Sequence, residues 1–219
     1  MRKVSSSTVG RLSIYLRVLT EIEGEGAETL SSEELAARCG TTAAQVRKDL
    51  SFFGTFGKRG RGYSVEELIG ALRSILGLGR RYRVALVGAG RIGVALLGYQ
   101  DFQRQGFYIE AVFDADPAKV GQRWGSTTVR PDAELEAALR TEDIDIVILA
   151  VPAESAQAVV DRVVAAGVRA VLNFAPTKLL VPAAVALKNV NMAVELEGLS
   201  FALASDGRRA TRTRTRRSA

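Results

Sequence analysis

Hydrophobic residues recur every three or four positions near the start of the chain, and this spacing predicts an amphipathic helix. The apolar stripe begins at Val9, continues to Ile22 and ends before Gly24. Residues 31–34 read Ser-Ser-Glu-Glu, the pattern of a capping box, and predict a short helix that continues through Cys39 before a stop at Gly40. Two consecutive helices are therefore expected within the first forty residues.

A third helix is predicted directly after this stop. Residues 42–45, Thr-Ala-Ala-Gln, form a second capping-box pattern, and the helix should extend from Ala43 to Phe53. Its apolar positions lie on one side, and the polar positions Arg47, Lys48 and Ser51 lie on another. Ser64 should cap one further helix that closes this part of the chain. The pair of helices around Gly40 matches a helix-turn-helix, with the second helix as the recognition helix.

The pattern changes after about residue 80, where short β-branched runs alternate with helical segments. Strand segments are predicted at residues 83–87, 108–113, 144–152 and 168–176, with helices at residues 94–97 and 156–167. Alternation of this kind is typical of an α/β domain built on a doubly wound parallel sheet. We place the domain boundary between residues 79 and 80, so that residues 80–194 form the second domain.

The net charge also differs between the two predicted domains. The net charge is +4 over residues 1–81, −4 over residues 82–207 and +6 over the last twelve residues. A polyanion should therefore meet the first domain and the tail. For the tail we keep open the alternative of a solvated segment without a specific role.

Composition excludes several classes of chemistry. The chain contains no histidine, which removes Ser-His-Asp and Cys-His nucleophile systems and His-ligated metal sites, so we predict no metal site. Cys39 is the single cysteine, so no intrachain disulfide can form and a reducing cytoplasm is the expected location. No apolar run is long enough to span a bilayer, so we expect no membrane partner.

A glycine-rich turn follows the first predicted strand of the second domain. Residues 88–93 read Gly-Ala-Gly-Arg-Ile-Gly, the spacing that binds a dinucleotide pyrophosphate at a helix N-terminus. Asp114 ends the next strand, where an acid would bind the ribose 2′-hydroxyl and favour NADH or NAD⁺ over the 2′-phosphorylated forms. Asp114 could instead be a simple turn residue at the end of a strand. Val151, Pro152, Asn173 and Phe174 lie at the same sheet edge and could flank a nicotinamide. Pro152 and Pro176 could instead simply terminate their strands.

A glycine-rich basic segment follows the predicted recognition helix. Residues 54–63 interleave four glycines with Lys58, Arg59 and Arg61, and resemble a β-hairpin wing that contacts phosphates or the minor groove. Arg47 and Lys48 alone would more often form a solvated face, but the adjoining wing favours DNA binding.

No catalytic residues are predicted beside the expected cofactor. Hydride transfer usually needs a proton donor or acceptor next to the nicotinamide, and the sequence offers no evident group of this kind. A cofactor bound without chemistry is a sensed ligand. Two alternatives stay open, namely a small nicotinamide-dependent oxidoreductase and a CoA-binding regulator.

Together these motifs resemble the Rex family of redox-sensing transcriptional repressors, over nearly the whole chain from Ser5 to about Leu203. Five segments carry the resemblance: residues 11–17, 45–54, 60–63, 88–93 and 172–176. The resemblance implies a homodimer with a winged-helix domain at residues 1–79 and a Rossmann domain at residues 80–194. It also implies a C-terminal helix at residues 195–206 that inserts into the partner subunit. Residues 207–219 would then be a disordered basic tail.

The resemblance further implies a repressor that binds inverted-repeat operator DNA when NADH is low and is released by NADH. The residues expected at the DNA are Gln45, Arg47, Lys48, Ser51, Lys58, Arg59, Gly60, Arg61 and Tyr63. Those expected at the cofactor are Gly88, Ala89, Gly90, Arg91, Ile92, Gly93, Asp114, Tyr99, Val151, Pro152, Asn173, Phe174 and Met192.

The family also implies a switch in which Arg17 and Tyr99 exchange hydrogen bonds with an acidic residue early in the last strand segment. This chain departs from the pattern, because Asn191 stands where an aspartate is expected. An amide forms weaker hydrogen bonds than a carboxylate, so we expect weaker stabilisation of the DNA-binding state.

Overall fold

The computed structural model describes residues 4–57, 61–125 and 127–215, with residues 205–215 described by their backbone alone. The chain divides into two compact units, Met1–Arg81 and Tyr82–Ala219, two residues later than the boundary expected from the sequence. Within the described residues, no helix is both long and apolar enough to cross a membrane.

In its described residues, the N-terminal unit consists of four helices and a small antiparallel sheet. The helices are α1 (Ser6–Gly24), α2 (Ser32–Arg38), α3 (Ala43–Ser51) and α4 (Val65–Ile75). They enclose one apolar core that includes Leu12, Leu19, Leu35, Val46 and Leu72. Val9, which the sequence pattern assigned to the apolar stripe of α1, is 42% exposed, and Thr8 is buried instead. Because an α-helix has 3.6 residues per turn, positions spaced by three and four residues do not stay on a single line along the helix. Val9, the first residue of the stripe, therefore lies outside the core.

The caps of these helices largely follow the sequence. Ser31 and Glu34 form a reciprocal capping box at α2, and the side chain of Ser64 accepts from the backbone N–H of Glu67 at α4. Thr42 caps α3 in the same way, but the side chain of Gln45 does not return the bond. The second predicted capping box is therefore only half formed, because the side-chain amide of Gln45 has another hydrogen-bond partner.

The described C-terminal end of the segment expected to form the wing belongs to a small antiparallel sheet. β2 (Tyr63–Ser64) pairs antiparallel with β1 (Thr29–Leu30), which precedes the helix-turn-helix. The predicted wing residues Lys58, Arg59 and Gly60 lie outside the described residues. The return strand therefore anchors the segment to the chain before α2.

The C-terminal unit is built on a seven-stranded sheet with the strand order β5-β6-β4-β3-β7-β8-β9. The predicted strands are β3 (Tyr82–Val87), β4 (Phe107–Asp114), β7 (Ile146–Leu149) and β8 (Ala170–Asn173). Three further strands were not predicted, namely β5 (Arg123–Trp124), β6 (Thr127–Pro131) and β9 (Ala186–Asn189). β5 pairs antiparallel with β6, and all other neighbours are parallel. Short edge strands carry a weak periodic signal, which explains why they were missed.

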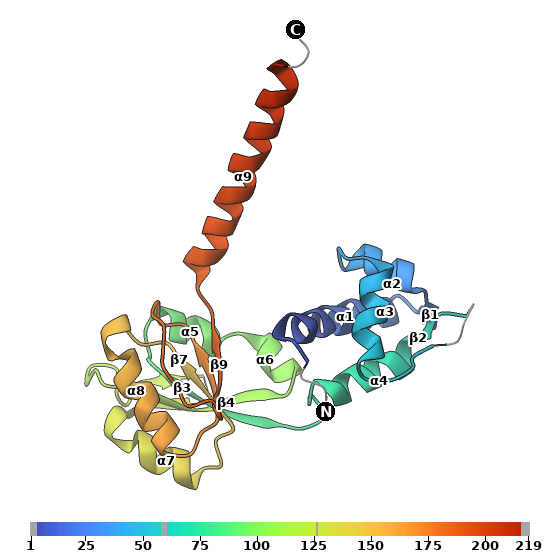
Figure 1. Cartoon of the computed structure of the whole chain (residues 1–219). Coiled ribbons are helices and arrows are strands. Elements are labelled where there is room, and N and C mark those ends of the chain that lie inside the picture. The colour runs from blue at the N-terminus through green and yellow to red at the C-terminus, as the bar shows by residue number, and fades with distance from the viewer. Residues whose placement is uncertain (1–3, 58–60, 126, 216–219) are drawn as a thin grey trace. The chain divides into compact units, whose positions relative to one another are not determined.

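Both faces of this sheet are covered, as a doubly wound fold requires. Alternate residues of β3 point to opposite sides: Ala85 and Val87 join one core, and Val84 and Leu86 join the other. The first core includes residues of α7 (Leu135–Thr141) and α8 (Ala153–Ala165), and the second is covered by α5 (Arg91–Leu97) and α6 (Gln100–Arg104). Figure 1 shows α7 and α8 together on one side of the strands.

The C-terminal helix is longer than the sequence analysis predicts. α9 spans Met192–Thr215, so it begins three residues before the expected start and includes residues 207–215 of the segment expected to be disordered. Alanine and arginine are strong helix formers, and a helix that has started extends at little cost per added residue. Residues 216–219 lie outside the described residues.

Candidate functional site

A cavity of about 980 Å³ lies at the carboxyl ends of β3, β4 and β7. This edge is where doubly wound sheets bind their ligands. The lining residues are Val87, Gly88, Gly90, Arg91, Ile92, Asp114, Ala115, Asp116, Lys119, Asp132, Ala150, Val151, Pro152, Ser155, Ala158, Val159 and Arg162. Seven residues predicted to contact a cofactor are therefore brought together: Gly88, Gly90, Arg91, Ile92, Asp114, Val151 and Pro152.

The three glycines of the turn after β3 have different structural roles. Gly88 has a φ of +104°, and a Cβ there would clash with the carbonyl oxygen of Ala150. A Cβ on Gly93 would clash with the carbonyl oxygen of Gly88, so this glycine permits the close packing of α5. Gly90, the N-cap of α5, faces open space. The turn therefore leaves room at Gly90 for a phosphate group to approach the backbone.

Asp114 is held at the end of β4 by bonds from both neighbouring turns. Its Oδ2 accepts from the backbone N–H of Ala89 at 2.6 Å, and its Oδ1 accepts from the backbone N–H of Asp116 at 2.8 Å. Burial alone would raise the pKa of this carboxyl group. The two backbone bonds and Lys119 outweigh burial and lower the pKa below its usual value. Asp114 is therefore an ionised acceptor, fixed in place by the backbone of the glycine-rich turn.

Lys119 is a cavity residue that the sequence analysis missed. Its Nζ lies 3.1 Å from Oδ2 of Asp114 and 3.7 Å from Oδ2 of Asp116. A basic residue five positions after the strand-end acid was the available sequence signal. This cation partly neutralises the carboxylate at the place where a ribose would bind.

A second group of charged residues that was not predicted includes Arg162 and Asp132, which both line the cavity. Arg162 of α8 donates to both carboxylate oxygens of Glu136 at 2.6 and 2.7 Å, and to Oδ2 of Asp132 at 2.6 Å. The hydrogen bonds from Arg162 lower the pKa of Glu136 to about 2. These contacts connect α8 to the segment after β6, and no local sequence pattern reveals such long-range partners.

Other residues predicted at the cofactor do not line this cavity. Ala89 and Gly93 belong to the same turn, Ala89 being buried and bonded to Asp114. Tyr99 is the N-cap residue of α6 and lines a separate cavity of about 170 Å³. Phe174 packs against the core on the α5 side of the sheet, and Met192 is 60% exposed at the start of α9. Cofactor contacts by these residues stay predictions.

Asn173 has a structural role that explains its burial. Its Nδ2 donates to the carbonyl oxygens of Ala175 and Thr177 and to Oδ1 of Asn189, and its Oδ1 accepts from the backbone N–H of Ala175. These bonds fix the turn after β8 and connect it to β9. A contact between its side chain and a cofactor is not needed to explain why an amide stands there.

The recognition helix α3 is anchored by a buried carboxylate. Asp49 is fully buried and accepts from Nε and Nη2 of Arg11 at 2.6 and 2.8 Å, from the hydroxyl of Tyr15 at 3.0 Å and from Nε2 of Gln45 at 2.9 Å. Burial favours the neutral acid, but the bonds from Arg11, Tyr15 and Gln45 lower the pKa of Asp49 below its usual value. Gln45 was predicted to contact DNA, and here its side chain holds α3 against α1.

The other predicted recognition residues lie on the solvent side of α3. Lys48 and Ser51 are exposed, and the hydroxyl of Ser51 donates to the carbonyl oxygen of Lys48 at 2.7 Å. Nη1 of Arg47 donates to Ser32 and Glu33 of α2.

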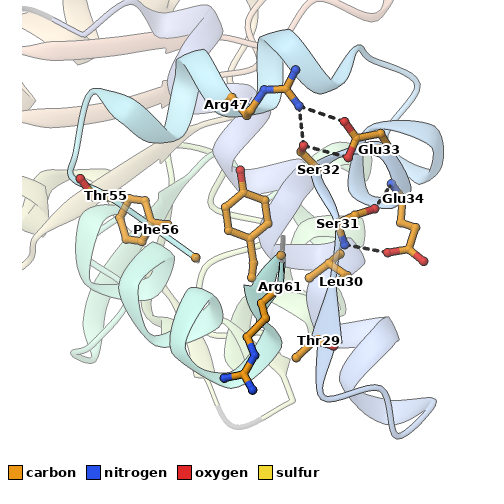
Figure 2. Close-up of a pocket in the computed structure, with 13 residues that line it drawn as sticks. Thr29, Leu30, Ser31, Ser32, Glu33, Glu34, Arg47, Thr55, Phe56 and Arg61 are labelled. Atoms are coloured by element: carbon orange, nitrogen blue, oxygen red, sulfur yellow. Dashed lines mark hydrogen bonds and ion pairs between the residues drawn. The ribbon is translucent and has the colours of Figure 1, made fainter. Parts of the chain in front are cut away.

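Tyr63 is only 8% exposed and belongs to the apolar core, so its ring packs inside the unit. Arg61 and Arg47 both line a cavity of about 740 Å³, and Figure 2 shows their side chains pointing in different directions.

The predicted switch residues lie in both units. Arg17 is exposed on α1, and the hydroxyl of Tyr99 lies 3.4 Å from Oδ2 of Asp101. Asn191 was expected in a strand segment, but β9 ends at Asn189. The Oδ1 of Asn191 accepts from the backbone N–H of Ala193, so this side chain caps the first turn of α9.

Comparison with known proteins finds two family models and several relatives that match this chain. A family model described as a CoA binding domain matches residues 80–177, and one described as the N-terminus of a putative DNA-binding protein matches residues 3–51. The redox-sensing transcriptional repressor Rex of Syntrophomonas wolfei is 46% identical, over 94% of this chain and 98% of the relative. Its counterpart in Streptomyces coelicolor is 43% identical, over 91% of this chain and 78% of the relative.

Two solved structures of a Rex-family repressor named RSP are also similar. RSP in complex with NAD⁺ and operator DNA is 38% identical, with a TM-score of 0.90 over 94% of this chain and 95% of the other. RSP in complex with NADH is 36% identical, with a TM-score of 0.86 over 94% of this chain and 97% of the other. The chain therefore belongs to the Rex family of redox-sensing transcriptional repressors.

Proposed function

We propose that this chain represses transcription by binding operator DNA through its N-terminal unit and that NADH in the C-terminal unit releases it. The observation that carries the proposal is the joining, in one chain, of a helix-turn-helix and a nucleotide cavity in which a fixed carboxylate meets a glycine-rich turn. The similarity to RSP, which binds operator DNA and both redox forms of the nucleotide, supports it.

The lining of the cavity fits a nicotinamide dinucleotide. The pyrophosphate would approach the backbone at Gly90, where there is open space before α5. The ionised Asp114 would accept a hydrogen bond from a ribose hydroxyl. Val151 and Pro152 would provide apolar contacts on the opposite side.

The regulatory action requires that the two redox forms differ in their effect. NADH must bind the arrangement that cannot hold DNA more tightly than the arrangement that can, because a ligand shifts an equilibrium only through such a difference. NAD⁺ would compete for the same cavity without imposing that change. The proposed output is therefore a response to the NADH/NAD⁺ ratio.

A homodimer is part of the proposal. The described side chains of α9 expose large apolar residues to an unusual degree, with Leu196, Phe201 and Leu203 each at least 66% exposed. A helix with so much exposed apolar surface is normally covered by a partner, and here we propose a second copy of the chain. Two recognition helices related by twofold symmetry would bind an inverted repeat.

We propose a sensor rather than an oxidoreductase. The ionisable groups that line the described cavity are Asp114, Asp116, Lys119, Asp132, Arg91 and Arg162. Lys119 forms ion pairs with Asp114 and Asp116, and Asp132 forms one with Arg162 of α8. This arrangement positions a nucleotide but presents no evident proton donor for a second substrate. A cytoplasmic location belongs to the same proposal, since the target is operator DNA.

The test is fluorescence anisotropy with a labelled duplex that the protein selects from genomic fragments, titrated with protein at fixed salt. Salt is fixed because phosphate contacts dominate affinity for DNA. NADH should abolish tight binding, whereas NAD⁺ should leave it in place. Recovery of no specific fragment, or indifference to both nucleotides, would contradict the proposal.

The family description of residues 80–177 favours one competing ligand, coenzyme A. The same assay therefore includes CoA at concentrations that cover those of NADH. If CoA displaces NADH and by itself releases the duplex, the regulator responds to CoA. Steady-state turnover of NADH with candidate carbonyl substrates tests the oxidoreductase alternative, for which we expect no turnover.

A further inference from the structure

A carboxylate lies directly against the predicted recognition helix. Oε1 of Glu33, in the first turn of α2, accepts from Nη1 of Arg47 at 3.0 Å. The same nitrogen donates to Oγ of Ser32 at 2.6 Å, and Ser32 donates to the other oxygen of Glu33 at 3.1 Å. Figure 2 shows Arg47 reaching from α3 to this pair, whereas Arg61 points away from it. Three side chains therefore form a closed set of hydrogen bonds.

This contact contributes little to the stability of the fold. The side chain of Arg47 is 54% exposed and that of Glu33 is 68% exposed. Ion pairs between exposed groups typically stabilise a protein by roughly 1 kcal/mol or less. The geometry of the pair, rather than its strength, is therefore the informative feature.

The contact engages a single nitrogen of the guanidinium group. Among the described residues, Nη1 donates both hydrogen bonds of Arg47, and Nε and Nη2 have no acceptor. An arginine held at one nitrogen keeps an edge with two parallel N–H groups for a guanine or a phosphate. Fixing the group in advance also reduces the conformational entropy lost on binding.

Glu33 has a second effect through its charge. Its carboxylate lies next to a cation expected to face DNA, so it opposes the approach of phosphates. Non-specific binding depends almost entirely on phosphates, whereas specific binding also gains from contacts with bases. A carboxylate at this place therefore lowers non-specific affinity more than specific affinity.

We propose that Glu33 is a specificity-determining residue of the DNA-binding surface. It acts by positioning Arg47 for a base and by disfavouring binding through phosphates alone. The inference rests on the proposed function, because it requires that α3 binds DNA. It adds a residue on α2, outside the recognition helix and outside the wing, to those that determine operator choice.

The experiment compares Glu33→Gln with Glu25→Gln in the full-length protein. Glu25 pairs with Arg38 at 2.7 Å in the same unit, so the control removes the same charge from a similar exposed pair that does not touch α3. Affinities are measured by fluorescence anisotropy at several salt concentrations. The two duplexes are an operator fragment selected by the wild-type protein and the same fragment with its sequence scrambled.

We expect Glu33→Gln to bind the scrambled duplex roughly three- to tenfold more tightly and to lose roughly tenfold in its preference for the operator. Glu25→Gln should keep the wild-type preference. In an Arg47→Lys background, where no bidentate contact can form, Glu33→Gln should change the preference by less than twofold.

Two results would overturn the inference. One is an operator preference in Glu33→Gln equal to that of Glu25→Gln, and the other is an equal gain in affinity for both duplexes, which would indicate a general charge effect. A wild-type protein that prefers no fragment would instead contradict the proposed function itself. Both outcomes are therefore read from the same titrations.

Discussion

Two carboxylates, one in each unit, show how differently the two sites are built. Asp114 is held chiefly by backbone N–H groups of Ala89 and Asp116, within a turn whose shape depends on glycine. Asp49 is held by the side chains of Arg11, Tyr15 and Gln45. The nucleotide site is therefore fixed by the path of the backbone, whereas the recognition helix is fixed by a network of side chains. The two sites should fail in different ways when residues are changed.

The largest effect is expected from a substitution in the nucleotide site, which is fixed by the path of the backbone. Gly88→Ala would place a Cβ against the carbonyl oxygen of Ala150 at a φ of +104°, so the turn cannot keep its shape. NADH binding should fall at least about a hundredfold, since the variant displaces both the phosphate-binding turn and Asp114. Isothermal titration calorimetry with NADH measures the loss.

Gly90→Ala provides the matched control for this change. A Cβ at Gly90 meets open space and an ordinary φ of −87°, so the turn should keep its fold. Its methyl group would occupy the space proposed for the phosphate, and NADH should bind more weakly without loss of thermal stability. Equal losses of stability in both variants would contradict the distinct roles assigned to the two glycines.

The second effect concerns the side-chain network. Asp49→Ala removes the hydrogen-bond acceptor of three side chains. The variant should therefore destabilise the N-terminal unit by about 2 to 4 kcal/mol. Water can replace part of the lost hydrogen bonding of Arg11, because this side chain is partly exposed. Operator binding should be lost while NADH binding is kept, because the two carboxylates belong to separate units. Urea unfolding and NADH titration of the same sample check both statements. Loss of NADH affinity would show that the units do not fail independently.

A smaller effect sharpens the description of the nucleotide cavity. Lys119→Met removes the cation that partly neutralises Asp114, so the carboxylate should repel a 2′-phosphate more strongly. The ratio of NADPH to NADH dissociation constants should rise roughly fivefold, because a charge of this kind at a partly exposed site contributes about 1 kcal/mol. Lys188→Met on β9 removes the same charge outside the cavity and should leave the ratio unchanged. An unchanged ratio in Lys119→Met would contradict the role given to this residue.

The smallest expected effect is a loss of folding stability at alkaline pH. Burial and the bond to Asp49 raise the pKa of Tyr15 to about 12, from an ordinary value of 10.0. The folded protein keeps its proton in this interval while the unfolded chain loses it, so stability should fall as the pH rises from 10.0 to about 12. Tyr15→Phe should be roughly 1 kcal/mol less stable at neutral pH and should lack this part of the alkaline decline. An identical pH profile in both proteins would contradict the assignment.

Local patterns predicted much of both sites. Helix caps such as Ser31 and Ser64 act within one turn of the chain, so their sequence signature is sufficient. The glycines at positions 88 and 93 and the acid at 114 have fixed spacings because one backbone turn determines them. These features could be predicted since their physical causes lie close together in the sequence.

Features that depend on distant partners were not predicted. Gln45 faces Asp49 only because α1 brings Arg11 and Tyr15 to the same place, and a helical pattern alone leaves Gln45 on the recognition face. Lys119 acquires its role from the turn that returns it to Asp114. Asn191 caps α9 because β9 ends at Asn189 and α9 begins at Met192. In each case the side chain has a partner that tertiary structure supplies.

The account depends most on the claim that the nucleotide cavity controls the DNA-binding unit. The direct measurement is the affinity of the full-length protein for its operator duplex at constant total nucleotide and salt, with the share of NADH varied against NAD⁺. We predict that affinity falls steadily as the share of NADH rises, and that Gly88→Ala binds the operator with the same affinity at every ratio. An affinity of the wild-type protein that does not change with the ratio would contradict the account.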